Sequence, residues 1–156
     1  MSPKVEALLT EAGVTFRLHP HPKLVTFEDA KAALPFDPAA MVKALVFRLP
    51  DARYAIVAMR AADRADYKRI ADALSLRRAD LRAATAGEVT EGLHMQPGGI
   101  VALPVNGALV LFDRGVEALG TIYCGTGSNE LTLEIAAADL IRAGGGRVAD
   151  VTKATA

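Results

Sequence analysis

The spacing of apolar positions alternates along the chain between the periods of helices and of strands. Apolar residues three or four apart predict amphipathic helices, and apolar residues two apart predict half-buried strands. Helical spacing predicts five helices, at residues 3–12, 27–34, 64–74, 86–91 and 136–143. Strand spacing predicts seven strands, at residues 14–18, 41–49, 54–59, 98–103, 108–113, 121–124 and 131–135. Four of the helices follow a residue that can cap the first turn, namely Ser2, Thr26, Asp63 and Thr85.

The order of these elements indicates the fold class. The segment LPDAR (residues 49–53) is a turn that joins the second and third predicted strands into a hairpin. The strands do not alternate regularly with helices, which favours an α+β fold with a mixed or largely antiparallel sheet. A chain of 156 residues without repeats or linkers fits one domain, so we expect a single domain over residues 1–156.

The strand MVKALVFRL contains a lysine among apolar residues. Alternation places Lys43 on the same face as Met41, Leu45 and Phe47. Three interpretations fit this position: a strand-end lysine that reaches water along its own methylenes, a register marker, or a cation at the mouth of a pocket. The strand alone does not decide between them.

Two glycine-bearing segments are candidates for ligand contact. The paired glycines of Gly98-Gly99-Ile100 allow close approach to the backbone, and they also fit a simple turn. The glycines and polar groups of CGTGSNE (residues 124–130) fit either a phosphate or ribose cradle or a plain hairpin. The usual catalytic sets are absent from the sequence, and we interpret Cys124 as a small buried residue and the histidines of the HPHP segment as structural.

Composition and charge limit the classes of function. Eighteen basic and eighteen acidic residues balance, so an RNA partner would be held by a local patch, and the densest basic run is LRRADLR at residues 76–82. One cysteine and three histidines without metal-ligand spacing predict no disulfide, no metal and no cofactor. The first segment is amphipathic rather than a signal peptide or membrane span, and we expect a cytoplasmic protein without a membrane or DNA partner.

Four segments taken in order carry a resemblance to a known family: HPHPKLVTFEDA, VKALVFRL, PGGIVAL and TIYCGTGSNELTLEIAAADLIRA. Together they resemble the YbaK and prolyl-tRNA synthetase-associated editing domain family over nearly the whole chain. The resemblance implies an α+β fold around a barrel-like sheet and a free-standing enzyme. This enzyme would hydrolyse the ester of a mischarged tRNA, such as alanine or cysteine on the proline tRNA. The implied partners are the tRNA acceptor end and a synthetase on which the domain could dock.

The resemblance also implies roles for individual residues. Lys43 would contact the substrate near the terminal adenosine or the scissile ester, and Leu45 would line the amino-acid pocket. The substrate-binding loops would be supplied by Gly98, Gly99, Ile100, Gly125, Gly127, Ser128 and Asn129. The chain differs from the family where Ala102 replaces a proline and where the late loop lacks basic residues. Two alternatives follow, a non-catalytic binding module for tRNA or aminoacyl nucleotides and a small-molecule hydrolase or binder.

Overall fold

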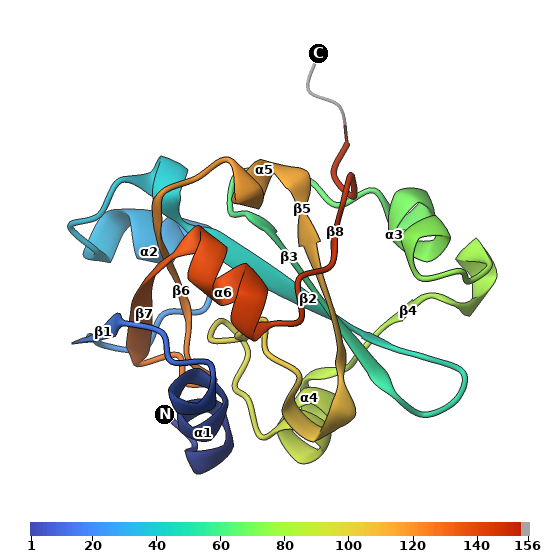
Figure 1. The fold of residues 1–156 in the computed structure, drawn as a ribbon, viewed down its shortest axis with the longest axis horizontal. Coiled ribbons are helices and arrows are strands. Elements are labelled where there is room, and N and C mark those ends of the chain that lie inside the picture. Colours follow the sequence, from blue (N-terminus) through green and yellow to red (C-terminus); the bar gives the residue numbers. More distant parts are fainter. Residues whose placement is uncertain (154–156) are drawn as a thin grey trace.

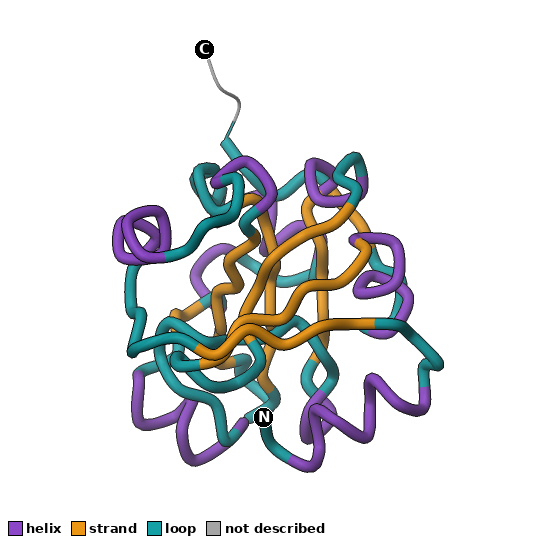
Figure 2. Tube along the Cα trace, turned by 90° about the vertical axis from the view of Figure 1, so that its left-hand side faces the viewer, coloured by secondary structure: helices purple, strands orange, loops and turns teal. Residues whose placement is uncertain are grey.

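The computed structural model describes residues 1–153, and the last three residues of the predicted domain lie outside this range. Two sheets are surrounded by helices, as Figures 1 and 2 show. The helices are α1 (Pro3–Glu11), α2 (Phe27–Ala33), α3 (Tyr67–Ala73), α4 (Ala86–Leu93), α5 (Arg114–Glu117) and α6 (Ala137–Ala143). The strands are β1 (Phe16–Pro20), β2 (Val42–Arg48), β3 (Tyr54–Arg60), β4 (Arg82–Ala83), β5 (Leu109–Asp113), β6 (Thr121–Gly125), β7 (Leu131–Ala136) and β8 (Val148–Ala149). Three short 3₁₀ turns are η1 (Pro38–Ala40), η2 (Arg78–Asp80) and η3 (Val105–Gly107).

The sheet topology confirms the predicted α+β class. One sheet has the antiparallel order β1-β7-β6, and the other has the mixed order β4-β2-β3-β5-β8. In the second sheet β2 and β3 form the predicted antiparallel hairpin, whereas β3 with β5 and β5 with β8 are parallel. A single bridge between Met41 and Tyr123 brings the two sheets together at the start of β2. The sheets remain open instead of closing into one barrel.

Two hydrophobic cores lie on opposite faces of the five-stranded sheet. The larger core joins the two sheets with α1, α4 and α6, and β2 contributes Val42 and Val46 to it. The smaller core lies beneath α3, and β2 contributes Phe47 to it. Lys43 shares the face of Phe47, as the alternation predicts, so its side chain starts on the α3 side of the sheet.

The predicted strand at residues 98–103 is wrong. This segment is an irregular loop, although Val101, Ala102 and Leu103 are buried. The Leu103 N–H donates to the Val101 carbonyl, and the Val105 N–H donates to the Leu103 carbonyl at 2.7 Å, so the loop is a series of tight turns. Its apolar run reflects burial rather than pairing, and a short apolar run does not distinguish the two.

Two predicted boundaries also differ from the structure. The third helix begins at Tyr67 after the cap Asp66, whereas Asp63 binds Arg60 instead of capping it. The first strand spans residues 16–20 instead of the predicted 14–18, so it continues through Pro20. Because β1 is an edge strand, the missing proline N–H breaks no interior ladder. The predicted caps Thr26 of α2 and Thr85 of α4 are confirmed, and each forms a capping box, with Asp29 and Glu88 respectively.

Candidate active site

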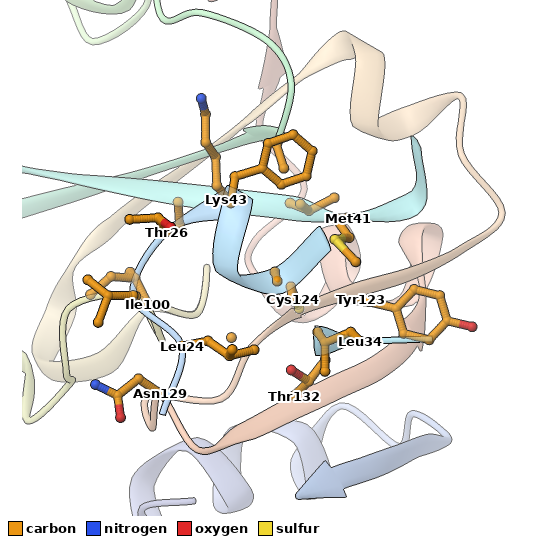
Figure 3. Close-up of a pocket in the computed structure, with 18 of the residues that line it drawn as sticks. Leu24, Thr26, Leu34, Met41, Lys43, Ile100, Tyr123, Cys124, Asn129 and Thr132 are labelled. Carbon is orange, nitrogen blue, oxygen red and sulfur yellow. The ribbon is translucent and has the colours of Figure 1, made fainter. Parts of the chain in front are cut away.

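A cavity of about 320 Å³ lies where the two sheets meet (Figure 3). The segment from His21 to Leu34 forms one wall, the start of β2 forms another, and the end of β6 lies opposite. The loop at residues 98–100 and the segment at residues 128–132, which runs into the start of β7, complete it. Seven of the predicted site residues line this cavity: Lys43, Leu45, Gly98, Ile100, Gly125, Ser128 and Asn129. Segments far apart in the sequence therefore converge on one site.

Lys43 is one of the residues that line the cavity. Figure 3 shows its side chain extending from β2 away from Leu24 and Cys124. The Lys43 Nζ donates to the Asp63 carbonyl oxygen at 2.6 Å and makes no ion pair within residues 1–153. Burial lowers the pKa of Lys43, and the positive charge of Arg64 lowers it further against the opposing effect of the Asp63 carboxylate. An ammonium has three N–H donors, so Lys43 keeps donors for a ligand.

Three glycines beside the cavity lie where the backbones of neighbouring segments come into direct contact. A Cβ built at Gly98 would lie 2.5 Å from the Leu24 carbonyl oxygen, and one at Gly99 would lie 2.4 Å from the Ser128 carbonyl. A Cβ at Gly125 would lie 2.4 Å from the Gly99 carbonyl oxygen. Real Cβ atoms do not approach backbone this closely, so glycine is required at these crossings. The main structural role of these glycines is thus to let the backbones of neighbouring segments approach each other closely.

Gly99 and Gly127 do not line the cavity but lie behind its wall. The Gly99 N–H donates to the Gln96 carbonyl at 3.0 Å, and the Gly127 N–H donates to the Gly99 carbonyl at 2.6 Å. The Gly99 N–H is therefore already bound and does not face a ligand. By contrast, the N–H groups of Gly98 and Ile100 donate to no acceptor within residues 1–153.

Asn129 ties the walls together through three hydrogen bonds. Its backbone N–H donates to the Gln96 side-chain oxygen at 3.0 Å, and its side-chain amide donates to the Pro97 carbonyl at 3.1 Å. Its carbonyl accepts from the Leu24 N–H at 2.9 Å. Asn129 is buried, so this amide positions the loops around the cavity.

His21 and Thr132 line the cavity and were not predicted as site residues. The His21 Nδ1–H donates to the Pro22 carbonyl at 2.8 Å, since a carbonyl can only accept. This bond leaves the Nε2 of a neutral ring as the acceptor for the buried Thr132 hydroxyl at 2.7 Å. The HPHP segment stands out in the sequence. Its His21 binds Thr132, which lies 111 positions further along the chain, so the sequence alone does not reveal this pair.

The helix α2 covers the cavity without belonging to either core. None of its residues is buried, and Phe27, Ala30 and the following Leu34 line the cavity. Beside it the rings of Phe36 and Tyr123 stack with centroids 4.0 Å apart. The sequence predicted the helix and its cap but gave no indication that it forms a cavity wall.

Cys124 is confirmed as a small buried residue. Its side chain belongs to the larger core, and burial raises the pKa of its thiol to about 12. A thiol at this pKa is almost entirely protonated at neutral pH and is a poor nucleophile. Within residues 1–153 no cluster of histidine, cysteine and acidic residues could hold a metal ion, and no helix is long and apolar enough to cross a membrane.

Comparison with solved structures identifies the same fold in several proteins. The hypothetical protein APE2540 is 25% identical, with a TM-score of 0.84 over 96% of this chain and 99% of that chain. A candidate trans-editing enzyme for prolyl-tRNA synthetase is 20% identical, with a TM-score of 0.80 over 99% of both chains. A candidate signal transduction protein from Marinobacter aquaeolei VT8 is 18% identical, with a TM-score of 0.71 over 99% of this chain and 31% of that one.

A comparison with curated protein sequences finds no significant match. The family model of the aminoacyl-tRNA editing domain matches residues 21–143. This range begins at His21 and includes every residue that lines the cavity. It also includes all four segments on which the resemblance rests, apart from the first two residues of the HPHP segment. The chain belongs to the aminoacyl-tRNA editing domain family.

Proposed function

We propose that this protein is a trans-acting deacylase that hydrolyses the ester of a mischarged tRNA. The expected substrates carry a small residue such as alanine or cysteine, with the proline tRNA as the expected carrier. The observation that carries the proposal is the small cavity lined by Lys43, in a chain of the editing family. The likeness to a candidate trans-editing enzyme for prolyl-tRNA synthetase supports a free-standing role in translation fidelity.

The chemistry requires little from the protein because an aminoacyl ester is already activated. A water oxygen attacks the carbonyl carbon, the bond from that carbon to the ribose oxygen breaks, and the ribose oxygen takes a proton. Negative charge grows on the carbonyl oxygen during attack, and a fixed cation or N–H donor stabilises it. The donors offered here are the Lys43 ammonium and the free N–H groups of Gly98 and Ile100.

The size and lining of the cavity support a small amino-acid substrate. Its volume of about 320 Å³ is at the low end of ligand pockets, which range from about 300 to 1,000 Å³. Leu45, Leu34 and Met41 supply apolar walls, with Leu45 as the expected contact of the amino-acid side chain. A pocket of this kind excludes larger side chains by their bulk, whereas one methylene alone changes binding by about 1–3 kcal/mol.

The experiment is hydrolysis of tRNAs mischarged with alanine, cysteine, serine or threonine. We expect selective deacylation by the wild type and a loss of about 10²–10³-fold in Lys43→Ala, the usual effect of removing one oxyanion donor. Lys68→Ala is the matched control, because Lys68 is exposed on α3 and outside the cavity. Circular dichroism checks the fold of both variants. Equal rates for Lys43→Ala and the wild type would disprove the role of this lysine.

A second candidate is a non-catalytic module that binds tRNA or an aminoacyl nucleotide. Two hydrogen bonds favour this function. The Gly99 N–H donates to the Gln96 carbonyl and the Asn129 amide donates to the Pro97 carbonyl, so neither donor is available to a substrate. Binding of an aminoacyl-adenosine analogue without ester hydrolysis would identify this function. If tRNA added nothing to affinity for the aminoacyl end, a small-molecule hydrolase or binder would be favoured instead.

Docking on a synthetase is part of the proposal. The formal net charge is zero, so the domain offers little general attraction for the phosphates of a tRNA body. A synthetase that already holds the tRNA would supply that attraction. Deacylation measured with and without prolyl-tRNA synthetase tests this point, and a rate that is unaffected by the synthetase would remove the partner from the proposal.

A further inference from the structure

A second groove leads away from the cavity along β2. Its volume is about 250 Å³, and it shares Ala44, Leu45 and Ile100 with the cavity. Its other walls come from the end of β2, α3, β4, α4 and the loop before Gly98, with the residues Val46, Phe47, Tyr67, Ala83, Ala84, Ala86, Val89 and Pro97. The two spaces therefore adjoin each other at Ala44, Leu45 and Ile100.

The groove follows an unpaired part of the β2 edge. On that side β4 pairs only with Phe47 and Arg48, and the bridge to the other sheet is at Met41. The Val46 carbonyl accepts from the Ala84 N–H, so Val46 directs its backbone groups away from β3. Backbone direction alternates along a strand, so the N–H and the C=O of Ala44 point the same way as those of Val46. Between β4 and the bridge, one donor and one acceptor thus face the groove.

A cation without an ion pair lies beside one wall of the groove. In the basic run at residues 76–82, Arg77 pairs with Asp80 at 3.0 Å, and Arg82 pairs with Glu88 at 2.9 Å. Arg78 makes no ion pair among the described residues, and its guanidinium donates to the Leu81 carbonyl at 3.4 Å and lies 4.9 Å from the centre of the Tyr67 ring that lines the groove.

The arrangement of Lys43 and Arg78 fits a chain of phosphates. Tyr67 packs against Phe47 with ring centroids 5.3 Å apart, and Phe47 shares its strand face with Lys43. The two unpaired cations thus lie on the same side of β2, Lys43 at the main cavity and Arg78 beside the Tyr67 ring of the groove. Cations in such a row bind a phosphodiester backbone, while the space between them is apolar and suits a nucleobase.

We propose that this groove binds the nucleotide that precedes the terminal adenosine of the tRNA. Its base lies along β2 with its hydrogen-bonding edge on the backbone N–H and C=O of Ala44, and its phosphate lies between Lys43 and Arg78. Cytosine fits these two groups, because its N3 accepts from an N–H while its adjacent amino group donates to a C=O. The inference rests on the proposed function, since it assumes that the aminoacylated adenosine occupies the main cavity.

Binding of amide-linked analogues tests the groove without any need for turnover. Alanine joined by an amide to 3′-amino-3′-deoxyadenosine is compared with the same compound carrying a preceding cytidine, by isothermal titration calorimetry. Stacking and edge contacts are worth about 1–3 kcal/mol per base, so the cytidine should tighten binding by roughly 5- to 150-fold. Equal affinity of the two compounds would overturn the inference.

Two pairs of variants locate the effect. Ala86→Leu fills the groove from the exposed first turn of α4 and should remove the gain from cytidine, whereas Ala138→Leu, on the exposed surface of α6, should retain it. Arg78→Gln should reduce the gain, whereas Arg77→Gln should not, because Arg77 is already paired. A gain that persists in Ala86→Leu would place the cytidine elsewhere and refute the groove.

The two proposals can fail separately. If mischarged tRNA is deacylated but cytidine adds no affinity, the groove inference is wrong and the proposed function stands. If neither analogue binds and no tRNA is deacylated, the proposed function is wrong and the groove inference falls with it. If both analogues bind equally and nothing is hydrolysed, the module is non-catalytic and the groove holds no nucleotide.

Discussion

Replacing Gly125 by alanine tests whether close backbone contact holds the candidate site together. Gly125 ends β6 and borders the cavity. A Cβ at this position would lie 2.4 Å from the carbonyl oxygens of both Gly99 and Ile100. These atoms belong to backbone rather than to flexible side chains, and the loop continues into the buried Val101. The loop therefore cannot yield without moving part of the core.

The magnitude follows from the cost of overpacking. Inserting a methyl group into a closely packed site costs about 1–3 kcal/mol. The matched control is Gly120→Ala, just before β6, where a Cβ would meet nothing within 4 Å. Alanine at such a site stabilises a protein by about 0.4–1 kcal/mol through the unfolded state. The free energies of unfolding of the two variants should therefore differ by about 1.4–4 kcal/mol.

Urea denaturation followed by circular dichroism measures this difference, and comparison of the m-values verifies that both variants unfold in the same way. For a domain of this size each kcal/mol corresponds to about 2–4 °C in Tm. Gly125→Ala should also weaken deacylation, because the loop at residues 98–100 would shift. A difference below about 0.5 kcal/mol between the variants, within the usual range of surface substitutions, would contradict the close-approach argument.

Three further predictions concern protonation. Burial lowers the pKa of Lys43 below 10.5, so deacylation that needs the ammonium should decline as pH rises through that lowered value. In Lys43→Arg the decline should disappear, as rate–pH profiles corrected for spontaneous hydrolysis would show. The hydrogen bond from Arg82 lowers the pKa of Glu88 to about 2. The ionised Glu88 therefore stabilises the fold above about pH 4.5, and this stabilisation is lost as the pH falls toward 2. Glu88→Gln should flatten the acid limb of a Tm–pH curve. Cys124, with a pKa of about 12, should react with a disulfide reagent at pH 8 only after unfolding; rapid reaction of the native protein would contradict its burial.

The sequence predicted the elements whose signals are local. The helix caps at Thr26 and Thr85 and the hairpin at residues 41–59 depend on neighbouring residues, and all three are present in the structure. The apolar residues at 98–103 predict a strand, but the segment is a loop, because an apolar run indicates burial but not pairing. Periodicity indicates which side chains are buried, whereas strand pairing depends on a second strand elsewhere in the chain.

The candidate site was predicted where a residue type is unusual for its position. Lys43 stood out on an apolar strand face, and the glycine pairs stood out as breaks. His21 and Thr132 did not, because their significance lies in a hydrogen bond between distant segments. The sequence also did not predict that Arg78 lacks an ion pair, because it does not show which of the arginines at residues 77, 78 and 82 lie next to a carboxylate.

The exposed position of α2 means that the helix depends on whatever fills the space beneath it. Its inward residues Phe27 and Ala30 face the cavity instead of a core, so little buried apolar area holds the helix in place. Elements with few buried contacts open at low free-energy cost. A ligand side chain in the cavity would act as the core residue that the chain itself lacks. Amide protons of α2 should then exchange slowly only when the cavity is occupied, so that substrate completes the fold that encloses it.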